Sequence, residues 1–110
     1  MATTTITSTL LTGLRNRIVE MAGYGRYRIG NTWYRAELNG AAVQGNGAIH
    51  ITFYIDRQDG NNPATEFQIC ASNGSVLVDR VEEISFAQTV DRILIRFKLG
   101  VSVGAAIQTV

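Results

Sequence analysis

Apolar and polar residues alternate with a period of two in several parts of the chain. The clearest example is AIHITFYI at residues 48–55, which places four large apolar side chains on one face: Ile49, Ile51, Phe53 and Ile55. Successive side chains of a strand point to opposite faces of its sheet. The pattern therefore predicts a β-strand with one face in the core.

The same alternation surrounds a turn signal in residues 65–103. A predicted strand with Phe67 and Ile69 on its apolar face leads to NG at residues 73–74, a dipeptide typical of tight hairpin turns. The strand VLVDRV and a polar crossing follow, and then a long alternating segment up to residue 103. Because this segment exceeds the usual strand length, we expect it to bend at Gly100 or to run past its own sheet.

One stretch near the N-terminus has the three- and four-residue spacing of a helix. Residues 10–22 carry apolar side chains at these intervals: Leu10, Leu11, Leu14, Ile18, Met21 and Ala22. The spacing predicts an amphipathic helix that covers a sheet. We expect Thr7 or Ser8 to cap its start, and Gly23 to end it in a left-handed conformation.

Glycine and asparagine pairs divide the middle of the chain. GN at residues 30–31 separates two short predicted strands in RYRIGNTWYRAEL and suits a two-residue hairpin turn. NG at residues 39–40 and GNG at residues 45–47 are further turn signals, with a short or bulged connection between them. Residues 56–64, which hold the only proline, are predicted to form a surface loop.

These elements predict the fold class. We expect an α+β fold, with an N-terminal helix packed on an antiparallel β-sheet or β-sandwich of about six to seven strands. Residues 1–110 are interpreted as a single domain. Residues 1–9 are interpreted as a flexible or docking arm and residues 104–110 as a tail.

The composition is that of a folded chain, with 110 residues, 45% hydrophobic residues and a net charge of +1. The single cysteine, Cys70, falls in a predicted strand and is interpreted as a buried structural thiol. No apolar run approaches the length of a membrane span, and no signal-peptide pattern is present. We therefore expect a protein that is made and kept in a reducing cytoplasm.

Motifs for catalysis or cofactor binding are weak. GYGRYRIG at residues 23–30 lacks the preceding strand and following helix of a phosphate-binding glycine loop. His50, the only histidine, has no nucleophile elbow and cannot form a common zinc site alone. The acidic and amide residues of loop 56–64 lack the order of a calcium-binding EF-hand. We therefore predict a protein that is not an enzyme and has no catalytic residue, cofactor or metal site.

Arginine and aromatic residues are interleaved in and around RYRIGNTWYRAEL. We interpret five of them as an interface with other protein subunits: Tyr24, Arg26, Arg28, Trp33 and Tyr34. These residue types are enriched in protein interfaces. Single-stranded nucleic-acid platforms use the same mixture, and aromatic-rich β-domains also bind carbohydrate. Both functions stay open as alternatives, although the net charge near zero favours an interface over nucleic-acid binding.

The order of elements resembles that of small domains in bacteriophage tail-fibre, tail-collar and baseplate proteins. In that family a helix precedes strands, and a Glu then opens an alternating strand, an Asx-Gly turn, a Val-Leu strand, a polar crossing and a long terminal strand. The matching residues here are Glu66, Phe67, Ile69, Asn73-Gly74, Val76-Leu77-Val78, residues 84–89 and residues 92–103.

The resemblance implies a function as well as a fold. It implies a non-enzymatic structural protein of the phage virion, a tail or baseplate component that connects to tail fibres through oligomeric contacts. The expected partners are other virion proteins and further copies of the chain. From the sequence itself we expect no membrane partner, and nucleic acid is the less favoured alternative. The expected location is the phage tail, after assembly in the cytoplasm of the bacterial host.

Overall fold

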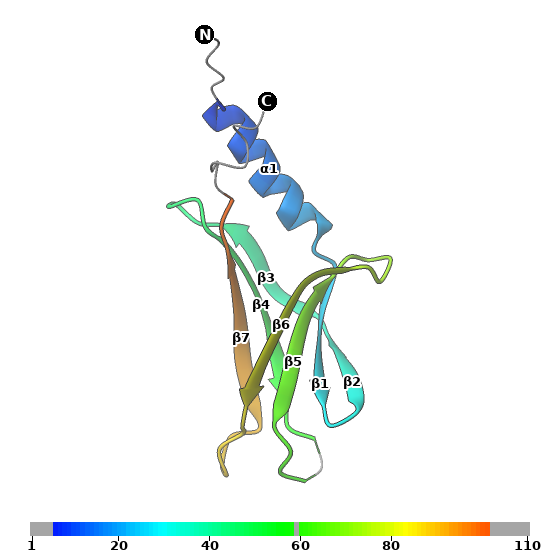
Figure 1. The fold of residues 1–110 in the computed structure, drawn as a ribbon. Helices are drawn as coiled ribbons and strands as arrows, with labels where there is room; N and C mark the ends of the chain where they lie inside the picture. Colours follow the sequence, from blue (N-terminus) through cyan, green and yellow to red (C-terminus); the bar gives the residue numbers. More distant parts are fainter. Residues whose placement is uncertain (1–5, 59, 102–110) are drawn as a thin grey trace.

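The computed structural model describes residues 6–58 and 60–101 (Figure 1). Within these residues one helix is followed by seven strands. In chain order the elements are α1 (Ser8–Met21), β1 (Tyr24–Ile29), β2 (Thr32–Ala36), β3 (Leu38–Val43), β4 (Ile49–Asp56), β5 (Ala64–Cys70), β6 (Val76–Ile84) and β7 (Arg92–Leu99). The predicted α+β class with an N-terminal helix is confirmed.

The strands form two antiparallel sheets, one of order β2-β1-β5-β6 and one of order β3-β4-β7. Sequence neighbours form the hairpins β1–β2, β3–β4 and β5–β6, whereas β1–β5 and β4–β7 join strands that are distant in sequence. The apolar faces of the two sheets enclose a common core. The sheets therefore pack as a β-sandwich.

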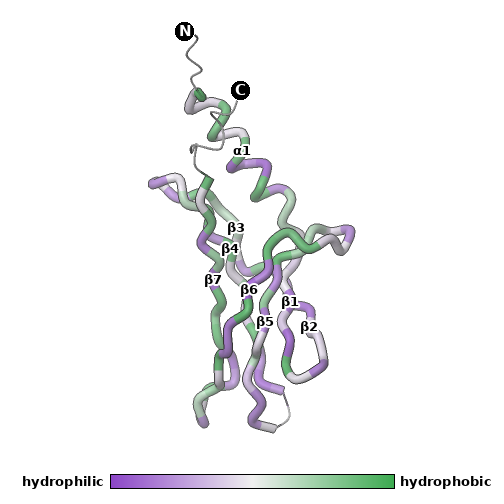
Figure 2. Tube along the Cα trace, viewed as in Figure 1, coloured by the Kyte–Doolittle hydropathy of each residue, from purple (hydrophilic) through white to green (hydrophobic). Residues whose placement is uncertain are grey.

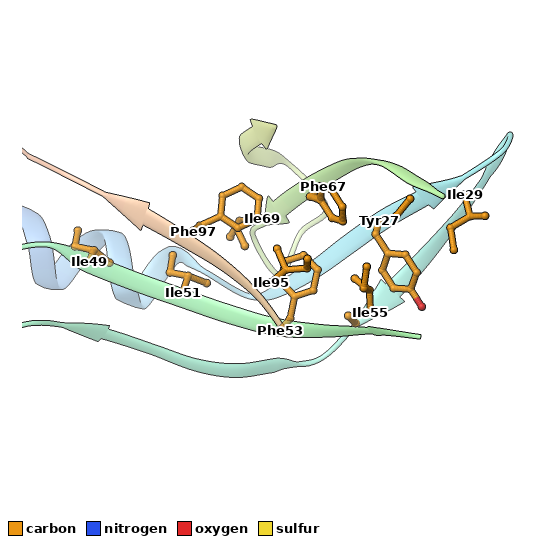
Figure 3. Packing of buried hydrophobic residues seen from close by; sticks show 12 residues of the cluster. Tyr27, Ile29, Ile49, Ile51, Phe53, Ile55, Phe67, Ile69, Ile95 and Phe97 are labelled. Carbon is orange, nitrogen blue, oxygen red and sulfur yellow. The ribbon is translucent and has the colours of Figure 1, made fainter. Parts of the chain in front are cut away.

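The core contains large side chains from both sheets (Figure 3). Phe53 of β4 and Phe97 of β7 stack with their ring centroids 6.0 Å apart, and Phe67 of β5 is fully buried in the opposite sheet. The four apolar residues expected on one face of β4 are all buried: Ile49, Ile51, Phe53 and Ile55. The period-two pattern of the sequence thus identified the core face of this strand.

Tyr27 of β1 links the two sheets near one end of the sandwich. Its hydroxyl oxygen accepts a hydrogen bond from the backbone N–H of Asp56 at 3.1 Å and another from the side-chain amide of Gln58 at 3.4 Å. The ring stacks on Tyr34, with centroids 5.5 Å apart. Because the polar end of the ring is satisfied, Tyr27 can be buried at little energetic cost.

Helix α1 begins earlier than its apolar spacing predicts. Thr7 is the N-cap, and its hydroxyl oxygen accepts a hydrogen bond from the backbone N–H of Leu10 at 3.4 Å. The arm predicted at residues 1–9 is therefore corrected, because residues 8 and 9 belong to the helix. Residues 1–5 of that arm lie outside the described residues.

The predicted left-handed helix end at Gly23 is wrong. The helix ends at Ala22 in an extended conformation, and Gly23 is not among the glycines with positive φ. Gly23 instead lies against the backbone of the β5–β6 turn. A Cβ at this position would lie 2.6 Å from the backbone nitrogen of Ser72. The backbone N–H of Gly23 donates a hydrogen bond to the carbonyl oxygen of Cys70 at 2.8 Å. The absence of a side chain permits this close approach.

Two of the three predicted turns in the middle of the chain are confirmed. β1 and β2 meet at Gly30, which has a φ of 62°, and residues 45–47 form the turn between β3 and β4. The signal at residues 39–40 is not a turn. It lies within β3, where the pairing with β4 shifts register between Leu38 and Gly40. The segment forms a β-bulge instead of a turn, in which Asn39 of β3 has no partner residue on β4.

The last strand is shorter than expected. β7 ends at Leu99, which pairs with Ile49, the first residue of β4. The ladder stops where its partner begins, and residues 100 and 101 are not part of a strand. Residues 102 and 103, the end of the predicted alternating segment, lie outside the described residues. Val101 packs against the core instead. The predicted tail, residues 104–110, lies outside the described residues.

The molecule is elongated, with extents of 63 × 27 × 24 Å. Helix α1 continues beyond one end of the sandwich and packs mainly against β3 and β4 (Figure 1). Apolar and polar segments alternate along this helix (Figure 2). Because the helix extends beyond the sandwich, much of it lies outside the space between the sheets, and none of its residues is buried.

Candidate functional site

Four of the five predicted interface residues lie together on the outer face of the β2-β1-β5-β6 sheet. Tyr24, Arg26 and Arg28 alternate along β1 with the buried residues of the core face, and Trp33 is the direct cross-strand partner of Arg28 on β2. Tyr34 does not join them. It points to the other face of β2 and packs against the core, where it stacks on Tyr27.

Arginine and aromatic side chains interleave on this outer face. The guanidinium carbon of Arg26 lies 4.4 Å from the ring centroid of Trp33, and that of Arg28 lies 5.6 Å from it. The guanidinium of Arg35, on β2, lies 4.1 Å from the ring centroid of Tyr24. Each such contact stabilises by about 0.5–1 kcal/mol at an exposed site. Together they restrict the orientations of side chains that would otherwise be mobile.

A hydrogen-bond network continues the surface onto β5 and β6. Nε of Arg26 donates to Oε1 of Gln68 at 2.5 Å, and Nε2 of Gln68 donates to Oδ1 of Asp79 at 2.9 Å. Arg28 pairs with Glu66, with Nη2 and Oε1 3.3 Å apart. Gln68 is only 7% exposed and lies at the centre of these contacts. Its amide therefore acts as donor and acceptor between a cation and an anion.

The two carboxyl groups of this network influence each other. A hydrogen bond with Asp79, followed by burial, raises the pKa of Glu66. The same hydrogen bond, together with one from Gln68, lowers the pKa of Asp79. Glu66 is thus the member of the pair that holds a proton more readily, and Asp79 is the member that stays ionised.

The charges of this surface balance. It carries three guanidinium groups and three carboxylates, those of Arg26, Arg28, Arg35, Glu37, Glu66 and Asp79. Strong binding to phosphates requires basic groups that are not already neutralised by the protein. The geometry therefore favours contact with another protein over binding of a nucleic acid.

Sequence reasoning missed the acidic half of the surface. Glu66, Gln68 and Asp79 were not grouped with Arg26 and Arg28, because nothing in the sequence fixes β5 as the neighbour of β1. The alternation of Glu66 and Gln68 with buried residues did predict that both lie on an outer face. Only the pairing of β1 with β5 brings them next to the arginines.

Cys70 and His50, the other single residues considered in the sequence, lie apart from this surface. Cys70 is buried and is not in a disulfide, as expected. His50 lies half-buried on the outer face of the other sheet, opposite Lys98 of β7. Among the described residues, no group of three or more His, Cys, Asp or Glu side chains is placed to hold a metal ion.

A cavity of about 450 Å³ lies between β2, β3 and one end of β4. Its charged side chains are paired with each other. Nε of Arg92 lies 2.8 Å from Oδ1 of Asp56, and Nε of Arg35 lies 3.2 Å from Oε1 of Glu37. These pairs place both carboxylates of the lining next to a guanidinium group.

An apolar groove of about 330 Å³ lies beside the C-terminal end of α1. It is lined by Ile18, Met21, Leu77, Val78, Leu99 and Gly100. The groove brings the helix, the start of β6 and the end of β7 together. It extends the exposed apolar surface of the helix onto the sandwich.

Comparison with protein-family models, with curated proteins and with solved structures finds no match for this chain. In the part of the chain that the structure describes, no helix has both the length and the apolar character to cross a membrane.

Proposed function

We propose that this chain is a non-enzymatic structural protein of a bacteriophage virion, located in the tail or baseplate. It connects to tail fibres through oligomeric contacts with other virion proteins and with further copies of itself. The resemblance in element order supports this proposal, from Glu66 through the Asn73-Gly74 turn to the terminal strand. Assembly takes place in the cytoplasm of the bacterial host.

Helix α1 carries this proposal. Of its 14 residues, all described by the structure, none is buried. Leu10, Leu14 and Met21 are 49%, 45% and 40% exposed. Isolated helices of this length are marginal in water, and most helices in proteins are stabilised by packing of an apolar face. A helix that exposes three large apolar side chains is typical of a subunit that completes its packing in an assembly.

The groove next to α1 supports the same function. Ile18 and Met21 continue the apolar surface of the helix toward Leu77 and Leu99 on the sandwich. An apolar side chain from another subunit would bury surface on both sides of this groove. Burial of apolar surface stabilises by about 25 cal/mol per Å², so contacts here favour assembly over the free chain.

The lack of enzymatic activity is part of the proposal. The acidic and basic groups of the 450 Å³ cavity neutralise one another, and His50 lies on a different surface, opposite Lys98. A sheet surface with paired charges suits contact between subunits rather than turnover of a substrate.

Antibody labelling of phage particles tests the proposed function. Particles are purified from the host that carries the gene, and gold-labelled antibodies raised against this chain are imaged by electron microscopy. We expect labels at the tail or baseplate. Absence of the chain from particles of a phage that expresses it in infected cells would overturn the proposal. Particles of a phage without the gene serve as the control.

A further inference from the structure

The outer face of the β2-β1-β5-β6 sheet carries two rows of residues that cross all four strands in register. We name them the tryptophan row and the aspartate row. The tryptophan row consists of Trp33, Arg28, Glu66 and Val81. The aspartate row consists of Arg35, Arg26, Gln68 and Asp79. The order of the four strands can be followed in Figure 1.

Each row changes character at its midpoint, between β1 and β5. On β2 and β1 both rows carry arginine side chains, and the tryptophan row also carries Trp33. On β5 and β6 the two rows carry acidic or amide side chains, and the tryptophan row also carries Val81. A two-fold axis parallel to the strands and between β1 and β5 would place each half over the other half of a second copy. Such self-complementarity is what an isologous interface between identical subunits requires.

We propose that this face is a homodimer interface, with a second copy of the chain as its occupant. The proposal rests on the proposed function and deepens it by naming the partner at one surface of the subunit. In this dimer the β2-β1-β5-β6 sheets of the two copies pack face to face with nearly aligned strands, which is a common geometry of sheet packing. The network of Arg26 and Gln68 holds the charged side chains in position before the copies meet.

The tryptophan row provides the apolar contact. Val81 is 75% exposed although it lies within a strand, and Trp33 is half-buried at the opposite edge of the sheet. The two-fold axis places Trp33 of each copy against Val81 of the other. Arg28 of each copy then faces Glu66 of the other, so opposite charges meet beside the apolar pair.

The aspartate row adds a second contact between opposite charges, and the charges of both rows together set the register. The axis places Arg35 of each copy opposite Asp79 of the other, and both residues are exposed in the single chain. A shift of the partner by one strand would bring Arg28 opposite Arg28, or Glu66 opposite Glu66, in the tryptophan row, and such like-charge contacts disfavour other arrangements. Because adjacent strands are about 4.8 Å apart, the face is narrow. We expect a dimer of modest affinity, as is usual for small interfaces.

Charge reversal at Arg35 and Asp79 tests the proposal. Arg35→Asp places two carboxylates opposite each other in the homodimer, and Asp79→Arg places two guanidinium groups opposite each other. We expect each variant to dimerise about tenfold or more weakly than the wild type. Sedimentation equilibrium at low salt measures the dissociation constants. Circular dichroism and thermal unfolding establish that both variants are folded.

A mixture of the two variants gives the decisive result. In a heterodimer of Arg35→Asp with Asp79→Arg, both contacts pair opposite charges, so we expect mixing to restore dimerisation. The double variant, Arg35→Asp with Asp79→Arg, is expected to dimerise alone for the same reason. Lys98→Asp, an exposed charge reversal on the outer face of the other sheet, is the matched control and should leave dimerisation unchanged.

Failure of this inference is distinguishable from failure of the proposed function. A mixture that stays as weakly associated as its components, or single variants that dimerise like the wild type, would overturn the homodimer interface. A wild-type chain without dimers would overturn it as well. The proposed function is decided separately, by whether phage particles contain the chain.

Discussion

Arg26 and Gln68 face each other across β1 and β5, and Nε of the arginine donates to Oε1 of the glutamine at 2.5 Å. The same glutamine donates to Asp79 on β6. A nearly buried amide therefore connects the basic strands to the acidic strands of the sheet. This connection gives the outer face a fixed pattern of charge, which a partner can recognise.

Replacement of this glutamine is expected to weaken the fold. Gln68→Leu removes the hydrogen bonds to Arg26 and Asp79, and the loss of partners for buried polar groups costs about 1–3 kcal/mol. Urea unfolding measures the change in the free energy of unfolding. Gln88→Leu, at an exposed position of the β6–β7 connection, is the control and should change it by no more than about 0.5 kcal/mol. Equal stability of the two variants would contradict a structural role for the network.

The fluorescence of Trp33 provides a second measure of the network. It is the only tryptophan of the chain, and the guanidinium of Arg26 lies over its ring. Gln68→Leu releases Arg26, so we expect a shift in the emission of the folded protein. An emission spectrum identical to that of the wild type would show that Gln68 does not position Arg26.

The carboxyl pair predicts a specific dependence of stability on pH. The pKa of Glu66 is raised above its ordinary value of 4.5, so the folded state binds this proton more tightly than the unfolded state. The resulting stabilisation is present below the ordinary value and is lost as pH rises through the raised value. As pH rises above the ordinary value of this carboxyl group, we expect the wild type to lose stability relative to Glu66→Gln, which has no such proton to release.

Asp79 has the opposite effect at lower pH. Its pKa is lowered from 3.8, so its contribution is present above that value and is lost as pH falls through the lowered value. Measurements above pH 5 therefore isolate Glu66, since Asp79 is ionised there in both states. Urea unfolding at a series of pH values tests the prediction. Parallel stability curves for wild type and Glu66→Gln would show that Glu66 has no raised pKa.

The packing of the two sheets predicts a strong effect at Gly25. A Cβ at this position of β1 would lie 2.7 Å from Cε1 of Phe53, which is fully buried on β4. Gly25→Ala therefore forces the ring or the backbone to move, at a cost of about 1–3 kcal/mol. Thermal and urea unfolding measure the change.

Two further variants identify the cause of that change. Gly45→Ala is the control, since no atom lies within 4 Å of the position of its Cβ. Phe53→Leu, combined with Gly25→Ala, provides space for the added methyl group, so the double variant should be more stable than the sum of its single changes predicts. Strict additivity would contradict a direct clash between the two residues.

Period-two alternation in the sequence predicted the strands well. Ile49 and Phe53 share the buried face of β4 because a half-buried strand requires an apolar residue at every second position. The NG signal at residues 39–40 failed, because the same dipeptide suits a bulge inside a strand as well as a turn. The end of the last strand was not predicted correctly, because it depends on where the partner strand β4 begins.

The candidate surface was predictable only on one side. Arg26, Arg28 and Trp33 belong to one hairpin, so the turn at residues 30–31 and the alternation of side chains bring them together. The contact between Arg26 and Gln68 joins residues that are 42 positions apart. Local propensity does not determine which distant strand pairs with β1, so the acidic half of the surface required the structure.

We propose that this chain completes its packing through oligomeric contacts at α1, and its mass in solution is the measurement that decides this. Light scattering across protein and salt concentrations should give a mass that is a multiple of 12.0 kDa and persists at high salt, because contacts of Leu10 and Leu14 are apolar. The double variant Leu10→Ser/Leu14→Ser should lower this mass, whereas Arg17→Ser, an exposed change on the same helix, should not. A wild-type mass of 12.0 kDa under every condition would contradict the claim.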